Sequence, residues 1–305
     1  MSDVAIQCLP ASAGDATRLA SRLGVPMHEI ELHRFPDGEL RVRVGPAAST
    51  TIIYIAFDQP NDKLLTVLFA AEALLRDGAE RLVLVAPYLC YMRQDAAFQK
   101  GEAVSQRVIG GLLAGIVDRI ITVDAHLHRT TDLQSVFPHI EADNLSAVPA
   151  IADALRGAGL DLRTIIVGPD EESRPWVSDL ADRLGVVHAV AQKSRRGDRS
   201  VEIEFADAKV FADHPVLLVD DIVSSGGTLM ACAKALAAAN AKTIDVIITH
   251  ALFPAEMASE FVRAGIHSIR STNSVPHPTN AFMLDDIFVG ALRNEMSSTG
   301  RPERT

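Results

Sequence analysis

Short runs of β-branched and aliphatic residues alternate along the chain with stretches whose apolar positions recur at helical spacing. Residues 51–57 and 82–86 are two such runs, and the second is apolar on both faces, like the buried strands of a parallel sheet. The apolar residues of 63–76 recur every three or four positions, which predicts a helix with one buried face. A second helix is expected over 105–116, followed by a strand over 119–123.

The same alternation returns in the second half of the chain. Strands are expected at 164–168, 216–219 and 244–249, and helices are expected from the apolar spacing within 177–184 and 229–236. Strands that alternate with helices of about 10–15 residues form βαβ units. The predicted fold class is therefore α/β, with mostly parallel sheets flanked by helices.

The two halves also resemble each other in detail. Residues 119–126 (Arg-Ile-Ile-Thr-Val-Asp-Ala-His) are similar to residues 245–251 (Asp-Val-Ile-Ile-Thr-His-Ala), and each segment follows a helical pattern. This predicts two copies of one α/β domain, with a boundary near 143–149. We therefore expect an N-terminal domain over 1–145 and a C-terminal domain over 146–305, in line with a prior of roughly 150 residues per domain.

The composition is that of a globular protein, with 48% hydrophobic and 22% charged residues, and it excludes a mainly disordered chain. The 29 basic and 39 acidic residues give a net charge of −10, which argues against nucleic-acid and membrane partners. No apolar run suffices for a transmembrane helix, no signal peptide is evident, and three widely spaced cysteines make no disulfide framework. These features together favour a cytoplasmic protein.

The strongest chemical signal is a Ser/Gly loop that follows two carboxylates at the end of an apolar strand and precedes a helix. Two glycines leave backbone N–H groups able to face a phosphate, and neighbouring hydroxyl groups and the helix N-terminus add to this cradle. The carboxylates are placed to accept hydrogen bonds from sugar hydroxyls. The alternative is a strand–turn–helix connection with a serine cap. The residues expected to hold a sugar phosphate are Asp220, Asp221, Ser224, Ser225, Gly226, Gly227 and Thr228.

This motif resembles the phosphoribosyl pyrophosphate motif of type I phosphoribosyltransferase folds, and neither a GxGxxG nor a Walker pattern occurs. Other segments are similar to the ribose-phosphate pyrophosphokinase family, and the resemblance spans nearly the whole chain. Taken alone, each of them is better explained as a turn, a polar loop or a hairpin. The segments are Arg34-Phe-Pro-Asp-Gly-Glu39, Pro87-Tyr-Leu-Cys-Tyr-Met-Arg-Gln-Asp95, Val123-Asp-Ala-His126 with Gly168-Pro-Asp170, and Ala191-Gln-Lys-Ser-Arg-Arg-Gly-Asp-Arg-Ser200.

The resemblance implies an enzyme of nucleotide biosynthesis that transfers pyrophosphate from ATP to the anomeric hydroxyl of ribose 5-phosphate, giving 5-phosphoribosyl 1-diphosphate and AMP. It implies a dimer-based homo-oligomer in which the ATP site is shared between subunits. Lys193 and Arg195 match the catalytic pair of a flexible loop, and His126 and Asp170 match the residues near Mg²⁺. The ATP-binding residues that it implies are Phe35, Asp37, Glu39, Arg93, Gln94 and Asp95.

The chain departs from the family pattern at two places. Residues 96–98 are Ala-Ala-Phe where the family usually continues with basic residues, so we extend no ATP contact beyond the Arg-Gln-Asp segment. Ser224 stands where many synthetases have an acidic residue, which resembles the archaeal-type branch, so regulation by phosphate and ADP is not carried over. His128 and Glu171 stay open as further metal ligands, and the general base stays open between a metal and Asp220.

Three other functions are weighed against this interpretation. A phosphoribosyltransferase would share the Ser/Gly loop but would need only one such domain, and the repeat counts against it. A non-catalytic subunit associated with a synthetase would typically lose the catalytic loop, whereas Lys193 and Arg195 are present. A regulatory DNA-binding relative is disfavoured by the acidic balance and by the lack of a basic recognition helix.

Overall fold

The structure, a computed structural model, shows two compact units that are built from one topology. Unit 1 contains residues 3–145 and 285–296, and unit 2 contains residues 146–284. The described residues are 3–127, 129–130, 132–196 and 200–296. No helix within these residues is both long and apolar enough to cross a membrane.

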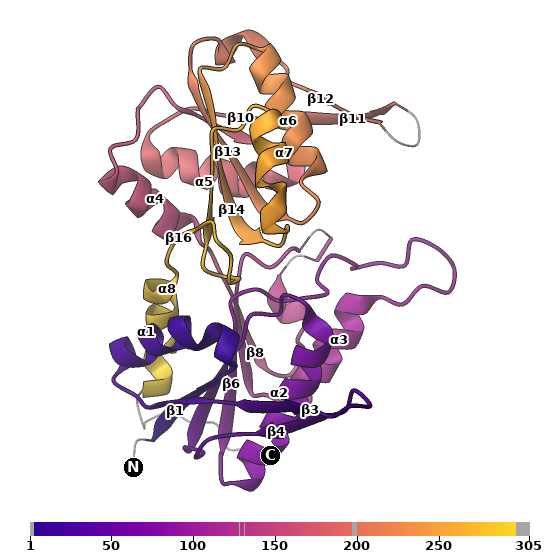
Figure 1. Ribbon diagram of the computed structural model, residues 1–305, viewed down its shortest axis with the longest axis vertical. Coiled ribbons are helices and arrows are strands. Elements are labelled where there is room, and N and C mark those ends of the chain that lie inside the picture. Colours follow the sequence, from indigo (N-terminus) through magenta and orange to yellow (C-terminus); the bar gives the residue numbers. More distant parts are fainter. Residues whose placement is uncertain (1–2, 128, 131, 197–199, 297–305) are drawn as a thin grey trace. The chain divides into compact units, whose positions relative to one another are not determined.

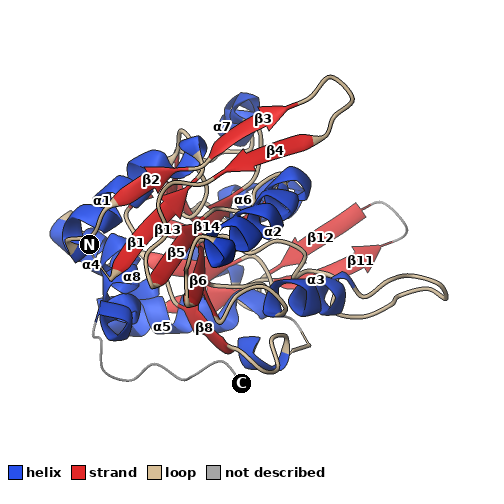
Figure 2. Ribbon diagram, turned by 90° about the horizontal axis from the view of Figure 1, so that it is seen from below, coloured by secondary structure: helices blue, strands red, loops and turns tan. Residues whose placement is uncertain are grey.

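Unit 1 is a six-stranded parallel sheet in the order β2-β1-β5-β6-β7-β8. Helices cover both of its faces, with α1 on one side and α2 and α3 on the other (Figures 1 and 2). Leu82, Val83, Leu84 and Val85 of β6 are fully buried as a result. The elements are β1 (Val4–Cys8), α1 (Ala13–Leu23), β2 (Met27–Glu29), β5 (Thr50–Tyr54), α2 (Pro60–Arg76), β6 (Arg81–Ala86), α3 (Ser105–Ala114), β7 (Arg119–Val123) and β8 (Glu141–Leu145).

Unit 2 repeats this sheet in the order β10-β9-β13-β14-β15-β16, again with parallel neighbours. Its core is formed by the apolar residues of the central strands and of α6. The two sheets confirm the predicted α/β class. The elements are α4 (Val148–Gly157), β9 (Ile165–Gly168), α5 (Arg174–Leu184), β10 (His188–Val190), β13 (Pro215–Val223), α6 (Gly227–Ala238), β14 (Thr243–Ala251), α7 (Ala258–Arg263), β15 (Ser268–Thr272) and β16 (Asn280–Phe282).

An antiparallel hairpin is inserted at the same point of each unit, between the second and third strands of its sheet along the chain. In unit 1 it is β3 (Glu31–Arg34) with β4 (Leu40–Arg43), and in unit 2 it is β11 (Gln192–Arg196) with β12 (Ser200–Glu204). The topology therefore corrects the repeat inferred from sequence. The strand β7 occupies the fifth place of its sheet, which in unit 2 belongs to β15, so the likeness of residues 119–126 to 245–251 was out of phase.

The C-terminal segment belongs to unit 1, so the expected domain over 146–305 is wrong at this end. The helix α8 (Asp285–Leu292) lies beside α1, as Figure 1 shows in yellow and indigo. Phe288 is 1% exposed and packs edge-on against Tyr54 of β5, with ring centroids 6.0 Å apart. Arg18 of α1 forms an ion pair with Asp285 at 3.3 Å. These contacts, together with a buried carboxylate from the turn that follows (Arg293–Met296), explain why this segment returns to unit 1.

Candidate active site

The Ser/Gly loop of unit 2 joins β13 to the N-terminus of α6. Gly226 precedes α6 with a left-handed backbone (φ 67°), and a Cβ placed on it would lie 2.5 Å from the ring of Phe261. Only glycine fits such a position without strain. Ser224 and Ser225 are exposed beside it. The loop thus presents hydroxyl groups and the N-terminus of a 12-residue helix to solvent, which is an anion-binding arrangement.

The two carboxylates before the loop lie inside β13 rather than after it. The strand was expected to end at 219, but it stays paired with β14 as far as Val223. Asp221 is 7% exposed and accepts the backbone N–H of Ile222 at 2.7 Å, whereas Asp220 is half-buried. The carboxylates are therefore fixed by the sheet, and Asp220 is the more accessible of the pair.

Asp170 lies close to Asp220 in unit 2. Burial raises the pKa of the Cys232 thiol on α6 to about 12, and the negative charges of Asp220 and Asp170 both add to this rise. The position itself follows from the strand pairing: Val167 of β9 lies opposite Leu218 of β13 in a parallel pair, so Asp170 and Asp220, a few residues further along, lie at the same end of the sheet. Gly168, two residues before Asp170, is required there, since a Cβ would lie 2.0 Å from the hydroxyl oxygen of Ser173.

Two further groups around Asp170 were left open by the sequence. Glu171 forms an exposed ion pair with Arg174 at 2.6 Å, and hydrogen bonding by that guanidinium lowers the pKa of Glu171. The carboxylate of Glu171 is therefore paired with Arg174 and is not offered beside Asp170 as a second ligand. His128, the other open candidate, lies outside the described residues.

The proposed catalytic pair of unit 2 lies in a strand, not in an irregular loop. Lys193 is paired with Ile203 and Arg195 with Val201 in the antiparallel hairpin β11–β12. Figure 1 shows this hairpin extending away from the sheet of unit 2. The side chains of both residues lie outside the described part of the structure. The sequence suggested a loop because the segment 191–200 has no apolar periodicity, but a projecting hairpin needs none.

The segment Pro87–Asp95 of unit 1 follows β6 and is tied down by backbone and side-chain hydrogen bonds. The N–H of Phe57 donates to the carbonyl of Tyr88 at 3.0 Å. Ser105, at the start of α3, donates its hydroxyl to the side-chain oxygen of Gln94 at 2.7 Å. Arg93 lies between these anchors and is exposed.

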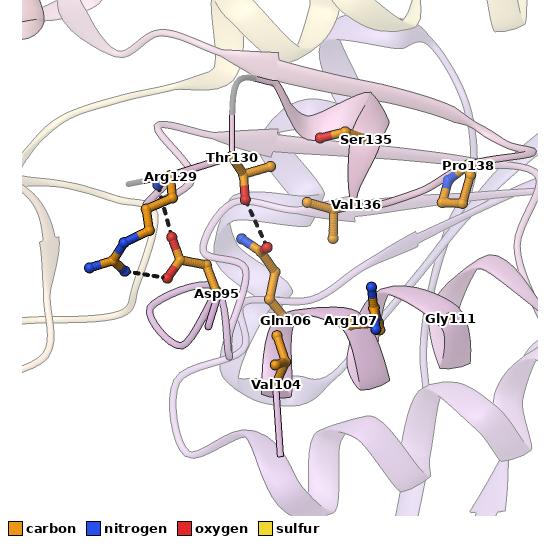
Figure 3. A pocket seen from close by; sticks show the side chains of 10 residues that line it. All are labelled: Asp95, Val104, Gln106, Arg107, Gly111, Arg129, Thr130, Ser135, Val136 and Pro138. Carbon is orange, nitrogen blue, oxygen red and sulfur yellow. Dashed lines mark hydrogen bonds and ion pairs between the residues drawn. The ribbon is translucent and has the colours of Figure 1, made fainter. Parts of the chain in front are cut away.

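Asp95 is held by Arg129, a residue that sequence reasoning missed. Its carboxylate is 1% exposed and accepts both the backbone N–H and the guanidinium of Arg129 at 2.8 Å (Figure 3). Burial opposes the charge of Asp95, but these hydrogen bonds outweigh it and lower its pKa. The pair borders a cavity of about 690 Å³ between α3 and the segment before β8, where Thr130 donates to Gln106 at 2.9 Å.

The residues of the Phe-Pro-Asp-Gly-Glu segment form the tip of the hairpin β3–β4 in unit 1. Figure 2 shows this hairpin standing out from the sheet. Phe35 and Glu39 close the turn, with the N–H of Phe35 donating to the carbonyl of Glu39 at 2.8 Å, and Asp37 accepts the N–H of Glu39 at 3.1 Å. All three side chains are exposed, so the tip presents an aromatic ring and two carboxylates to solvent.

His126 follows β7 in unit 1 and is half-buried. The backbone before it is fixed to β8, because the N–H of Asp124 donates to Leu145 and the N–H of Ala125 donates to the side chain of Asn144, both at 2.8 Å. Asp124 has a left-handed backbone (φ 38°), which is uncommon outside glycine. Among the described residues, no three His, Cys, Asp or Glu side chains gather as a ready metal site.

The Ser/Gly loop at the end of a parallel sheet defines unit 2 as a phosphoribosyltransferase-like domain, and the matching topology of unit 1 makes the chain a tandem pair. Family models agree with this. Residues 5–116 match the N-terminal domain of ribose phosphate pyrophosphokinase, and residues 142–281 match the phosphoribosyl transferase domain. The chain belongs to the ribose-phosphate pyrophosphokinase family.

Individual relatives cover most of both chains. The ribose-phosphate pyrophosphokinase of Methanopyrus kandleri is 34% identical over 265 residues, 86% of this chain and 89% of that one. The enzyme of the same name from Thermococcus kodakarensis is 33% identical over 261 residues, 84% and 89% of the two chains. The crystal structure of phosphoribosylpyrophosphate synthetase from Mycobacterium smegmatis covers 96% of this chain and 98% of its own, with a TM-score of 0.81 and 22% identity. That structure supports the fold.

Proposed function

We propose that this chain transfers the pyrophosphoryl group of ATP to the anomeric hydroxyl of ribose 5-phosphate, giving 5-phosphoribosyl 1-diphosphate and AMP. The observation that carries the proposal is the Ser/Gly loop before α6, with Asp220 and Asp170 at the same end of the sheet, in a chain that belongs to this family along both units.

Unit 2 holds the ribose 5-phosphate in this proposal. The 5-phosphate lies in the loop, where the N-terminus of α6 and the hydroxyl groups supply donors without adding charge. The accessible Asp220 accepts hydrogen bonds from ribose hydroxyls, and the buried Asp221 supports it from within the sheet. The residues of the proposed subsite are Asp220, Asp221, Ser224, Ser225, Gly226, Gly227 and Thr228.

Unit 1 holds ATP. The exposed Arg93 and the half-buried Gln94 contact the nucleotide, and Asp95 keeps this segment in place through Arg129. The hairpin tip, with Phe35, Asp37 and Glu39, is exposed and supports recognition of the adenine of a neighbouring subunit. An aromatic ring stacks on a purine, and carboxylates accept from its amino group. The enzyme is then a homo-oligomer whose ATP sites are shared within dimers.

The donor chemistry fits Mg²⁺. In unit 2 the carboxylate of Asp170 supplies the kind of oxygen ligand that this ion prefers, which phosphate oxygens and water would complete. In unit 1 the proposed metal-associated residue is His126. When bound, the ion neutralises part of the charge of the transferring phosphates. The protein residues orient the substrates around it.

The chemistry is a displacement at phosphorus. The anomeric oxygen bonds to the β-phosphorus of ATP, the bond from that phosphorus to the α–β bridging oxygen breaks, and AMP leaves with that oxygen. Catalysis then consists mainly of positioning and charge stabilisation, in which Lys193 and Arg195 face the charge that develops on the phosphoryl oxygens. Asp220 accepts the hydroxyl proton in this scheme, and a bound Mg²⁺ would supply the alternative by making that hydroxyl more acidic.

Incubation of the purified protein with Mg²⁺-ATP and ribose 5-phosphate tests the proposal. AMP is expected only when the sugar phosphate is present, and Lys193→Ala is expected to lower kcat by about 10²-fold or more. Lys209→Ala, at an exposed position outside the site, is the matched control and should keep full activity. AMP release without the sugar, or equal activity of the two variants, would overturn the mechanism.

A further inference from the structure

The loop between β5 and α2 in unit 1 occupies the same topological place as the Ser/Gly loop of unit 2. In both cases the chain leaves the third sheet strand along the sequence and enters a long helix. The residue before each helix has a left-handed backbone, with φ 49° at Gln59 and φ 67° at Gly226. The two units thus share a left-handed residue at this helix N-terminus, although the residues themselves differ.

The chemistry of the unit 1 loop is opposite to that of a phosphate cradle. Pro60 stands at the first helical position, where unit 2 has Gly227, and proline has no N–H to offer an anion. The ammonium of Lys63 turns back onto the loop, donating to the carbonyl of Ala56 at 2.8 Å and to the carboxylate of Asp58 at 2.5 Å. The ammonium of Lys63 is therefore bound to acceptors of the loop itself and is not offered to a ligand.

The first turn of α2 instead anchors the segment that follows β6. The phenol of Tyr91 donates to the side-chain oxygen of Asn61 at 2.5 Å. Tyr91 itself has a left-handed backbone, with φ 61°. Such a conformation costs a non-glycine residue about 1 kcal/mol or more and persists only where the surroundings hold it. Two strained residues, Gln59 and Tyr91, thus flank one short hydrogen bond.

We propose that Tyr91 and Asn61 are positioning residues that hold Arg93 and Gln94 for ATP. Tyr91 lies two residues before Arg93, and the αL turn at Tyr91 sets the direction of the chain at that point. The hydrogen bond to α2 fixes this turn on one side, and the bond from Ser105 to Gln94 fixes the segment on the other. This inference rests on the proposed use of ATP, but it assigns a role to two residues outside the proposed ATP-binding set.

A double-mutant cycle tests the pair. Tyr91→Phe removes the donor and Asn61→Ala removes the acceptor, and each is expected to raise KM for ATP about fivefold, because a hydrogen bond is worth about 1 kcal/mol. The double variant should be no worse than either single one. KM for ribose 5-phosphate and kcat should stay within about twofold of the parent. Asn61→Asp keeps an acceptor oxygen and should keep KM for ATP near the parental value.

A second variant separates positioning from folding. Tyr91→Gly relieves the left-handed strain, so its Tm should equal or exceed that of the parent while its KM for ATP rises. Unchanged KM for ATP in Tyr91→Phe, or equal rises in KM for both substrates together with a lower Tm, would overturn the inference. Calorimetric titration with a non-hydrolysable ATP analogue gives the same comparison independently of turnover. An inactive parent that still shows the expected affinity differences would refute the proposed reaction alone.

Discussion

Glu295→Ala tests how firmly the C-terminal segment is built into unit 1. Glu295 lies in the turn after α8, and its side chain is 6% exposed. Its carboxylate accepts from Nε of Arg81 at 2.8 Å and from Nη1 of Arg119 at 2.9 Å. These two arginines begin the neighbouring strands β6 and β7. One carboxylate therefore links the last described turn of the chain to the middle of the sheet.

The expected loss of stability is about 3 kcal/mol. Removing one partner of a buried ion pair costs about 3–5 kcal/mol. The low end applies here because Arg81 and Arg119 each keep a second carboxylate from β8. Glu72→Ala is the matched control, since its partner is Arg76 and the two side chains are 67% and 72% exposed. That exposed pair contributes at most about 0.5 kcal/mol.

Hydrogen exchange of the β6 and β7 amides measures the effect. Because 1.4 kcal/mol is a factor of ten, Glu295→Ala should speed their exchange through unfolding by roughly 10²-fold, and Glu72→Ala by about twofold at most. The fluorescence of Trp176 of α5, the single tryptophan, reports on the folding of unit 2 in the same samples. Equal protection of β6 and β7 in the two variants would refute the reasoning.

The pH dependence of stability gives a second test of the contacts of Glu295. Burial opposes ionisation of Glu295, but hydrogen bonds from Arg81 and Arg119 outweigh it and lower its pKa. A lowered folded pKa stabilises the protein above the unfolded value of about 4.3 and ceases to do so as pH falls through the folded value. The urea midpoint should therefore fall more steeply in the parent than in Glu295→Ala when pH drops from 7 to 3.

Two further substitution and labelling predictions concern the interior. Gly226→Ala forces a Cβ to 2.5 Å from Phe261 at a left-handed position, so it should cost about 1–3 kcal/mol of stability and raise KM for ribose 5-phosphate. Gly14→Ala, in helix α1 with nothing within 4 Å of the new Cβ, should cost no stability and leave this KM unchanged. Burial raises the pKa of the three cysteine thiols, Cys8, Cys90 and Cys232, to about 12. A disulfide reagent at pH 8 should therefore label them only after the chain unfolds. Rapid labelling of the folded chain would contradict this prediction.

The sequence predicted the fold best where burial on both faces leaves an uninterrupted apolar run. Residues 82–86 were expected as a strand, and β6 spans Arg81–Ala86. The strand β8 was missed because its sequence, Glu-Ala-Asp-Asn-Leu, is mostly polar, as an edge strand can be. The placement of α8 could not be found locally. Its partner α1 lies more than 260 residues earlier, and apolar spacing shows that a helix has a buried face but not what covers it.

In the candidate site, too, the sequence predicted local features but not contacts between residues that are far apart along the chain. The Ser/Gly loop could be predicted from the sequence because an anion cradle is made by consecutive residues between a strand and a helix. The contacts that hold the proposed ATP-binding segment could not be predicted from the sequence. Asn61 and Tyr91 are 30 residues apart, and Asp95 and Arg129 are 34 residues apart. Each pair meets only because parallel strands bring their carboxyl ends to one edge of the sheet.

The comparison of the two equivalent loops also explains how a chain with a net charge of −10 suits anionic substrates. In unit 2 the proposed phosphate cradle has neutral donors, so in this proposal local geometry rather than global charge attracts the phosphate. In unit 1 the residue before the helix, Gln59, is also left-handed. Pro60, however, lacks the N–H, and Lys63 forms an ion pair with Asp58. A glycine at position 59 would therefore not restore a cradle. The two loops share this conformation, and in the proposed function the residues after it decide whether the loop binds a ligand or supports a neighbouring segment.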